Sequence, residues 1–510
     1  MSKRKENIFR NAILIVVLVS MLPIMILGRY NHPTGDDYYY GAETHRALEE
    51  TGSVAAALAE AARGTLYDYQ TWQGTYSAMF LMRLSPTVFS EEAYHWVTTV
   101  ILLLLTGGIF YLLKALLCDW LKVGRLPWMA VAAVLSVLAV QTVPTPAESM
   151  FWYNGSMYYT GYFAVTLFFW GLIVQFLCRT HEQGGTAAVP TLCRTVFPTV
   201  LLAVFLAGGN YISLLPSMIM LVLVTGILVW KRDRRRAWVL GSITAAMLCG
   251  FAVNAMAPGN AVRQSGMWQI APWKAVAKSL IQGIRYMEAW MGIWWLIAAL
   301  LLTPVFWNMY RRITFSFRYP VMVVGLMYGI FCSMSCPTFY TMNSTGPARV
   351  VAICYYGFLL FSFAAYWYVL GYCYRRLHDG ACTRKRLLQR CCGKLESVFG
   401  RPRAAYALWG GMLLLLCLVQ LGNGRMAGCT GSVALRSLLS GEAVLYQQEY
   451  EARVALLEDD TLEEVVLPPF VNRPPLLYVG DLNHDPLEPT NVKVALFYGK
   501  KSVSVSCAEE

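Results

Sequence analysis

Apolar runs of about 20 residues recur along the whole chain, and they restrict its fold more than any other feature. A run of this length is what an α-helix needs to cross about 30 Å of hydrocarbon, because each residue advances it by 1.5 Å. The composition agrees, with 57% hydrophobic and 14% charged residues, whereas an ordinary soluble protein is about 25% charged. The sequence therefore predicts an all-α polytopic membrane protein.

We place eleven spans along the chain, near residues 9–28, 94–117, 126–143, 157–178, 195–209, 212–230, 237–255, 288–308, 319–336, 350–373 and 404–422. The fifth and sixth form one hairpin that breaks at residues 208–210. The first follows a basic stretch, as in a signal peptide, but Leu27 is followed by no small-x-small cleavage site. We therefore expect a retained first helix.

The Lys and Arg residues cluster in alternate loops, as the positive-inside rule describes for cytoplasmic loops. This places the amino terminus in the cytoplasm, and an odd number of spans places the carboxyl terminus outside the cell membrane. The rule also accounts for the net charge of +12 without a nucleic-acid partner.

Two domains follow from these spans: a transmembrane domain over residues 1–422, with a first outer loop at 29–93, and an extracytoplasmic α+β cap over 423–510. In the loop, residues 42–63 predict a helix that breaks at Thr51-Gly52, and 66–84 predict a helix lying at the membrane interface. In the cap, residues 435–460 predict a helix. Turn residues separate four expected strands at 464–470, 476–482, 492–498 and 502–506.

Two adjacent acids, Asp36 and Asp37, open the first outer loop. Neighbouring carboxylates repel, so they need a cation, a proton or a hydrogen-bonded partner. They could bind Mg²⁺ or Mn²⁺, with His32 or His45 as a third ligand, or act as a general base on an acceptor hydroxyl. The alternative is a polar helix start, with Asp36 capping a helix that begins near Tyr38.

Aromatic residues accompany these acids. Tyr38 and Tyr39 follow the pair, and the loop at 144–159 joins Glu148 to a run containing Trp152, Tyr153 and Asn154. Such rings stack on sugars, which would make these segments a binding surface for a polar, ring-shaped ligand. They also form the interfacial belt of most membrane proteins, so both interpretations stay open.

Outer cations are few. Arg263 follows a turn signal after the seventh span, and Arg349 precedes the tenth. Arginine binds phosphate in a bidentate manner, so the two could hold a lipid-linked phosphate or pyrophosphate. Each could instead reach toward lipid headgroups.

Several short segments, in this order, resemble a known superfamily: the DDYYY segment at 36–40, residues 69–74, 151–156, 208–210 and 257–263, and a final strand from Asn491 to Gly499. Together with the many spans, they are similar to the GT-C superfamily of integral-membrane glycosyltransferases. More specifically, they resemble the bacterial multispanning family near the phage-type serotype-converting glucosyltransferases. The similarity covers most of the chain, although each motif is short.

The resemblance implies an enzyme that moves a hexosyl or pentosyl group from a polyprenyl-phosphate carrier to a glycan or lipid acceptor of the cell envelope, on the outer face. The superfamily's catalytic or metal-binding acid then falls on Asp36 or Asp37. Many such enzymes have a Glu after Gly-Gly-Asn, where this chain has Tyr211, so the role of that Glu does not transfer.

The predicted site has Asp36, Asp37 and Glu148 as catalytic residues, and the Asp pair as metal ligands. The predicted substrate-binding residues are Tyr38, Tyr39, Trp72, Trp152, Tyr153, Asn154, Asn210, Asn260, Arg263 and Arg349. One rival function is transport or flipping of lipid-linked sugars, which favours mid-membrane ionisable residues and inverted repeats that we do not find in the sequence. A non-catalytic envelope protein is the other rival.

Overall fold

The computed structural model describes residues 3–182, 189–378 and 428–506. Within these ranges, eight helical segments are long and apolar enough to cross a membrane: Arg10–Tyr30, Glu91–Trp120, Tyr153–Thr180, Tyr211–Trp230, Arg234–Ala255, Ile293–Tyr310, Pro320–Met342 and Ala348–His378. Two shorter apolar helices, Arg125–Gln141 and Thr195–Ala207, accompany them. The polytopic all-α class is confirmed. The predicted span at 404–422 lies outside the described residues.

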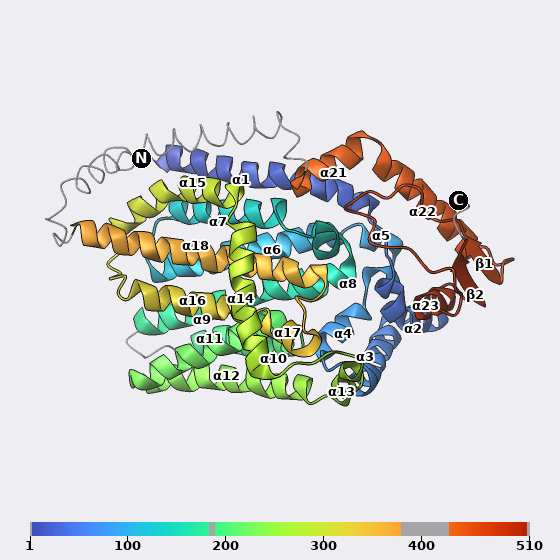
Figure 1. Ribbon diagram of the computed structural model, residues 1–510, viewed down its shortest axis with the longest axis horizontal. Helices are drawn as coiled ribbons and strands as arrows, with labels where there is room; N and C mark the ends of the chain where they lie inside the picture. Colours follow the sequence, from blue (N-terminus) through green and yellow to red (C-terminus); the bar gives the residue numbers. More distant parts are fainter. Residues whose placement is uncertain (1–2, 183–188, 379–427, 507–510) are drawn as a thin grey trace.

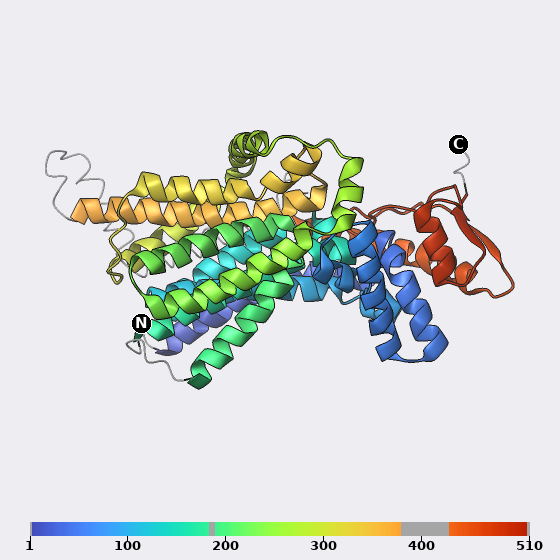
Figure 2. The same ribbon diagram turned by 90° about the horizontal axis from the view of Figure 1, so that it is seen from below.

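The apolar helices run side by side along the long axis of the molecule (Figures 1 and 2). They are α1 (Lys3–Leu27), α6 (Val97–Leu113), α7 (Arg125–Gln141), α9 (Tyr162–Glu182), α10 (Val189–Ala207), α11 (Tyr211–Trp230), α12 (Arg234–Ala255), α15 (Ile293–Tyr310), α16 (Pro320–Ser333) and α18 (Ala348–His378). One large apolar cluster joins α1, α6, α7, α15 and α18, and a second joins α9 to α12. Helix α14 (Pro272–Trp290) crosses the bundle instead of running along it (Figure 1).

The segment predicted as the first outer loop folds into short helices at the end of the bundle away from the amino terminus (Figure 1). They are α2 (Asp36–Thr51), α3 (Val54–Thr71), α4 (Tyr76–Met82) and α5 (Glu91–Tyr94). The break predicted at Gly52 is confirmed, because this glycine ends α2 in the left-handed region with φ of 63°.

The continuous helix predicted over 66–84 is wrong, because the chain breaks between α3 and α4. Helix α13 (Pro258–Ser265) packs into this break. A Cβ atom at Gly74 would lie 1.9 Å from the Asn254 carbonyl oxygen, and one at Gly259 would lie 2.5 Å from the Trp72 nitrogen. The two backbones therefore touch at a joint that only glycine allows.

The tail contains α21 (Thr430–Leu439), α22 (Glu442–Glu458), β1 (Glu464–Leu467), α23 (Pro489–Phe497) and β2 (Ser502–Val505). Strands β1 and β2 pair in parallel, with Val465 opposite Val503. The helix at 435–460 is confirmed in outline, with a break between α21 and α22. Two of the four predicted strands are wrong, because 476–482 forms turns and loop and 492–498 is mostly α23.

Helix α23 forms because its first turn is stabilised locally. Pro489 stands at its first position, and the Glu488 carboxylate accepts hydrogen bonds from the Thr490 and Asn491 amides. The side chains it buries, Asn491, Val494 and Ala495, follow helical spacing.

The tail covers one side of the first outer loop. Helix α23 packs against α2, and α21 packs against α1 (Figure 1). Tyr38 and Ala42 of α2 share a small apolar cluster with Val494 and Phe497 of α23. The amino end of α2 is therefore held between the end of the bundle and the tail.

Candidate functional site

The acid pair lies in the first turn of α2, which begins at Asp36 with Gly35 as its N-cap. The interpretation of Asp36 as a cap is therefore wrong. Both carboxylates lie where the partial positive charge of a helix amino terminus favours them. Asp37 performs part of the capping role, because its Oδ2 accepts a hydrogen bond from the Thr34 amide at 3.1 Å.

Asp37 is fully buried and bonded on both oxygens. Its Oδ2 also accepts the Tyr94 hydroxyl at 2.6 Å, and its Oδ1 accepts the Asn154 amide at 3.2 Å. Burial raises the pKa of Asp37 to about 7, although these hydrogen bonds act in the opposite direction. The carboxylate thus ties α2 to the segments that carry Tyr94 and Asn154, and it has no contact with solvent.

Asp36 has the opposite environment. It is half-buried, and within the described residues its carboxylate has no hydrogen-bond partner. Burial raises its pKa, and the positive charge of Arg349 opposes that shift. Of the two acids, Asp36 is therefore the one that is open to a ligand.

Arg349, in the first turn of α18, connects Asp36 to the second predicted acid. Its Nη1 lies 3.3 Å from Glu148 Oε2, and its backbone amide donates to the same oxygen at 3.3 Å. The guanidinium carbon lies 5.1 Å from the centroid of the Trp152 ring and 5.8 Å from that of Tyr159. The cation thus pairs with Glu148, acts on Asp36 through its charge and is lined by aromatic rings.

Arg263 is the second cation at this end of the bundle. It donates a hydrogen bond to Gln73 Oε1 and lies 5.1 Å from the Trp72 ring centroid. Burial raises the pKa of Tyr40, Asp36 raises it further, and Arg263 lowers it. Tyr40 therefore lies in the electric field of both Asp36 and Arg263, which places them in one neighbourhood.

Tyrosine rings and methionines form a cluster near the two arginines: Tyr158 lies in the field of Arg263, and Tyr159 lies beside Arg349. Tyr39 and Tyr40 pack edge to face at 5.1 Å, and Tyr158 and Tyr159 do so at 4.6 Å. Tyr40 packs with the side chains of α4, and Tyr158 lies against the same cluster. The wall is aromatic and bears hydroxyl groups, which suits the apolar faces and polar edges of a sugar.

Beside Asp37, the side chain of Asn154 is 2% exposed, and neither its oxygen nor its nitrogen has a partner within the described structure. The indole nitrogen of buried Trp152 has none either. An unbonded buried polar group costs about 1–3 kcal/mol, so such groups mark places where water or a ligand completes the structure.

Four other predicted binding residues hold the fold together. The Tyr38 hydroxyl bonds to Tyr450 of the tail at 2.8 Å. Asn210 caps α11 and donates to the Tyr158 carbonyl at 2.7 Å. Asn260 bridges the Gly74 amide and the Asn254 carbonyl, and the Tyr153 hydroxyl donates to the Leu81 carbonyl at 3.0 Å.

A divalent cation does not fit the Asp pair as these residues stand. Both Asp37 oxygens already accept hydrogen bonds, and the described residues bring together no group of three His, Cys, Asp or Glu side chains. His32 is buried against Tyr450, where burial lowers its pKa to about 3, and His45 stacks on Phe497. We therefore derive no chemical step from a metal.

Sequence reasoning missed Tyr94, which bonds Asp37, and Gln73, which holds Arg263. No motif contains Tyr94, and the motif that contains Gln73 does not give its role, because each contact forms only when segments distant in the chain meet.

No family model, no curated protein and no solved structure matches this chain. The resemblance to GT-C glycosyltransferases therefore stays a prediction, and the site must be interpreted from its own chemistry.

Proposed function

We propose that this protein is a membrane glycosyltransferase that moves a sugar from a polyprenyl-phosphate donor to a glycan or lipid acceptor of the cell envelope. The observation that carries the proposal is the carboxylate of Asp36, which is half-buried, has no hydrogen bond within the described structure and lies in the field of Arg349. A base, a phosphate-binding cation and an aromatic wall at one end of the bundle are what such a transfer requires.

The donor would lie with its prenyl chain among membrane lipids and its phosphate at the arginines. Arg349 makes one side-chain hydrogen bond to Glu148, and its guanidinium has five N–H donors. Donors remain that can bind phosphate oxygens. Arg263 would supply a second positive charge. The tyrosines between them would contact the sugar ring.

In the transfer, the acceptor oxygen forms a bond to the anomeric carbon while the bond from that carbon to the phosphate oxygen breaks. Asp36 takes the acceptor's proton, and the polyprenyl phosphate leaves with both electrons of the broken bond. The sugar carbon passes through an oxocarbenium-like state. Burial raises the pKa of Asp36, which strengthens it as a base at neutral pH. Glu148 would orient Arg349.

The proposed orientation places this end of the bundle outside the cell membrane, with the amino terminus in the cytoplasm. The basic segments that favour a cytoplasmic location lie at the opposite ends of the helices: Arg311 and Arg312 follow α15, and Arg375 lies in the last turn of α18. The tail over 423–510 would then be an extracytoplasmic cap on the site.

The test is the variant Asp36→Asn, which keeps the shape of the side chain and removes the base. In cells lacking the native protein, we expect it to lower transfer of sugar to the surface polysaccharide by at least 100-fold. Glu50→Gln is the matched control, because Glu50 lies on the same helix, is exposed and pairs only with Arg46 in the described structure. Full transfer by Asp36→Asn would contradict the proposal.

The transporter rival predicts a different lipid phenotype. Loss of a transferase leaves the lipid-linked sugar accumulated on the outer leaflet, whereas loss of a flippase leaves it on the inner leaflet. Labelling intact cells with a sugar-oxidising reagent that cannot cross the membrane separates the two outcomes.

A further inference from the structure

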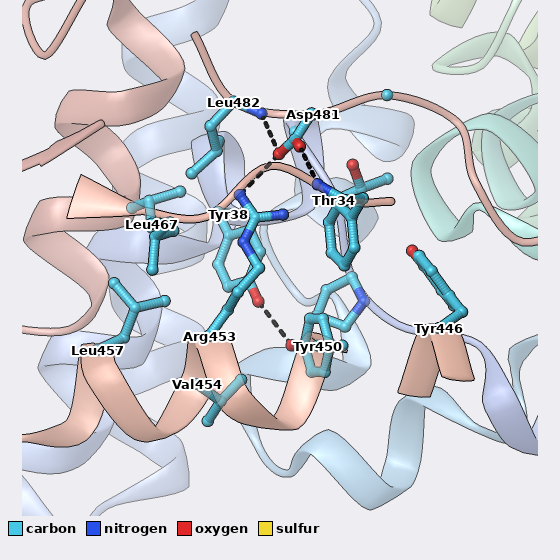
Figure 3. A pocket seen from close by; sticks show the side chains of 15 residues that line it. Thr34, Tyr38, Tyr446, Tyr450, Arg453, Val454, Leu457, Leu467, Asp481 and Leu482 are labelled. Carbon is cyan, nitrogen blue, oxygen red and sulfur yellow. Dashed lines mark hydrogen bonds and ion pairs between the residues drawn. The ribbon is translucent and has the colours of Figure 1, made fainter. Parts of the chain in front are cut away.

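A cavity separate from the arginine site lies between the tail and the loop that precedes α2. It has about 490 Å³ of empty space, its open mouth included, and its lining includes Thr34, Tyr446, Arg453, Phe470 and Gly480 (Figure 3). Residues of α22 line one side, and the loop at 33–35 lines another.

Arg453 is the charged group of this cavity. Its side chain is 6% exposed and its Nη2 bonds Asp481 Oδ1 at 2.7 Å, while its guanidinium carbon lies 4.1 Å from the Phe470 ring centroid. Within the described residues this is its only hydrogen bond, so further N–H donors remain available (Figure 3).

Asp481 has much less capacity left than Arg453. Its Oδ1 also accepts the Leu482 amide at 2.8 Å, and its Oδ2 accepts the Phe470 amide at 3.3 Å. Because the acid is bonded by three donors and the arginine by one acceptor, the cavity has spare donors. It therefore favours a ligand rich in negatively charged oxygen.

The rest of the lining suits a sugar ring. Tyr446 and Phe470 pack against each other with their ring centroids 5.0 Å apart, and they form an aromatic part of the cavity wall. The hydroxyls of Tyr446 and Thr34 have no hydrogen-bond partner within the described structure. Aromatic walls with free hydroxyl groups bind the faces and edges of a pyranose.

We propose that this cavity is a second binding site, for a sugar that carries a carboxylate or a phosphate. The oxyanion would bind Arg453, and hydroxyl groups of the sugar would bond the hydroxyls of Tyr446 and Thr34. The site uses none of the residues assigned to transfer, so it does not depend on that proposal. Because the Thr34 amide also bonds Asp37, a ligand here would contact the loop from which α2 begins.

Binding to the purified full-length protein in lipid nanodiscs, measured by calorimetry, tests the proposal. The probes are glucuronate, glucose 1-phosphate and neutral glucose. We expect at least one acidic sugar to bind at least 10-fold more tightly than glucose, since it gains a charge-assisted hydrogen bond. The tighter acidic probe identifies the oxyanion. Equal affinity for all three would overturn the proposal.

Gly480→Leu locates the binding, because it adds a bulky side chain at a residue that lines the cavity and removes no charge. A Cβ atom at Gly480 meets no atom within 4 Å, so the fold should accept it, and an unchanged melting temperature checks this. Gly428→Leu is the matched control, because that glycine is equally unobstructed and does not line the cavity. Acidic-sugar binding should disappear in the first variant and persist in the second. Native affinity in Gly480→Leu would refute the site.

Discussion

Replacing Asp37 by alanine should destabilise the protein without removing the proposed catalytic base, Asp36. The change leaves the Tyr94 hydroxyl and the Thr34 and Asn154 amides without their acceptor. Each buried unbonded group costs about 1–3 kcal/mol, about 6 kcal/mol for three at mid-range. The variant also no longer buries a carboxylate whose pKa rises from 3.8 to about 7, a relief of about 4 kcal/mol. A loss on the order of 2 kcal/mol remains.

The assay is thermal unfolding of the purified protein at pH 8, together with sugar transfer in cells grown at low temperature. We expect Asp37→Ala to melt several degrees below the native protein. Tyr94→Phe, which removes only one hydrogen bond to the same carboxylate, should cause a smaller decrease. Both variants should still transfer sugar at the low temperature, because Asp36 is unchanged.

An Asp37→Ala variant that melts like the native protein but transfers no sugar would contradict the structural role of Asp37. That result would give Asp37 the chemical role assigned here to Asp36. A protein that melts lower and still transfers sugar would support the division of roles.

Three more predictions follow from buried or bridging groups. Folding raises the pKa of Asp37, so the folded protein binds the Asp37 proton more tightly than the unfolded chain does. The stabilisation that this proton gives is complete below about pH 4 and is lost as pH rises through about 7. The melting temperature should therefore fall between pH 5 and 8, and Asp37→Ala should remove this dependence on pH. Asp68→Ala leaves Arg83, which is 7% exposed, without its 2.7 Å partner, and should cost about 3–5 kcal/mol by chemical unfolding. An unchanged unfolding curve would mean that Glu43, 3.8 Å from Arg83, suffices. Tyr450→Phe removes the hydroxyl that bonds Tyr38 and Glu91 at 2.8 Å each. Limited trypsin digestion should therefore release the tail faster than in the native protein. Equal rates would show that apolar packing alone holds the tail.

The sequence was sufficient for the class of fold, because the length of an apolar run has a direct physical meaning in a membrane. The sequence was insufficient where one segment fits both the alternation of a strand and the spacing of a helix. Residues 492–498 alternate as a strand would, yet the Glu488 cap and the buried Asn491 make them a helix. The break before Tyr76 was missed for another reason. Gly74 lies in the break because the end of α12 and Ala257, far away in the sequence, occupy the space where its side chain would be.

Several of the glycine and asparagine motifs act together in the structure. Asn260 bonds the Gly74 amide, and the Tyr211 hydroxyl bonds Asn254, so three short motifs form one joint beside Arg263. A residue whose motif suggests ligand binding can thus instead hold in place a neighbouring residue that binds the ligand. This is why Arg263 stays a candidate for phosphate binding, while Asn260 does not.

Asp36 and Asp37 are adjacent in the sequence but have different environments in the structure. Consecutive residues of an α-helix project about 100° apart, because 3.6 residues complete a turn. Once α2 begins at Asp36, the two carboxylates must diverge, and they do. Asp37 is directed into the protein, where three donors bond it, and Asp36 stays half-buried in the field of Arg349. A pair that could share a cation in a loop therefore divides, in a helix, into one acid that holds the site together and one that can react.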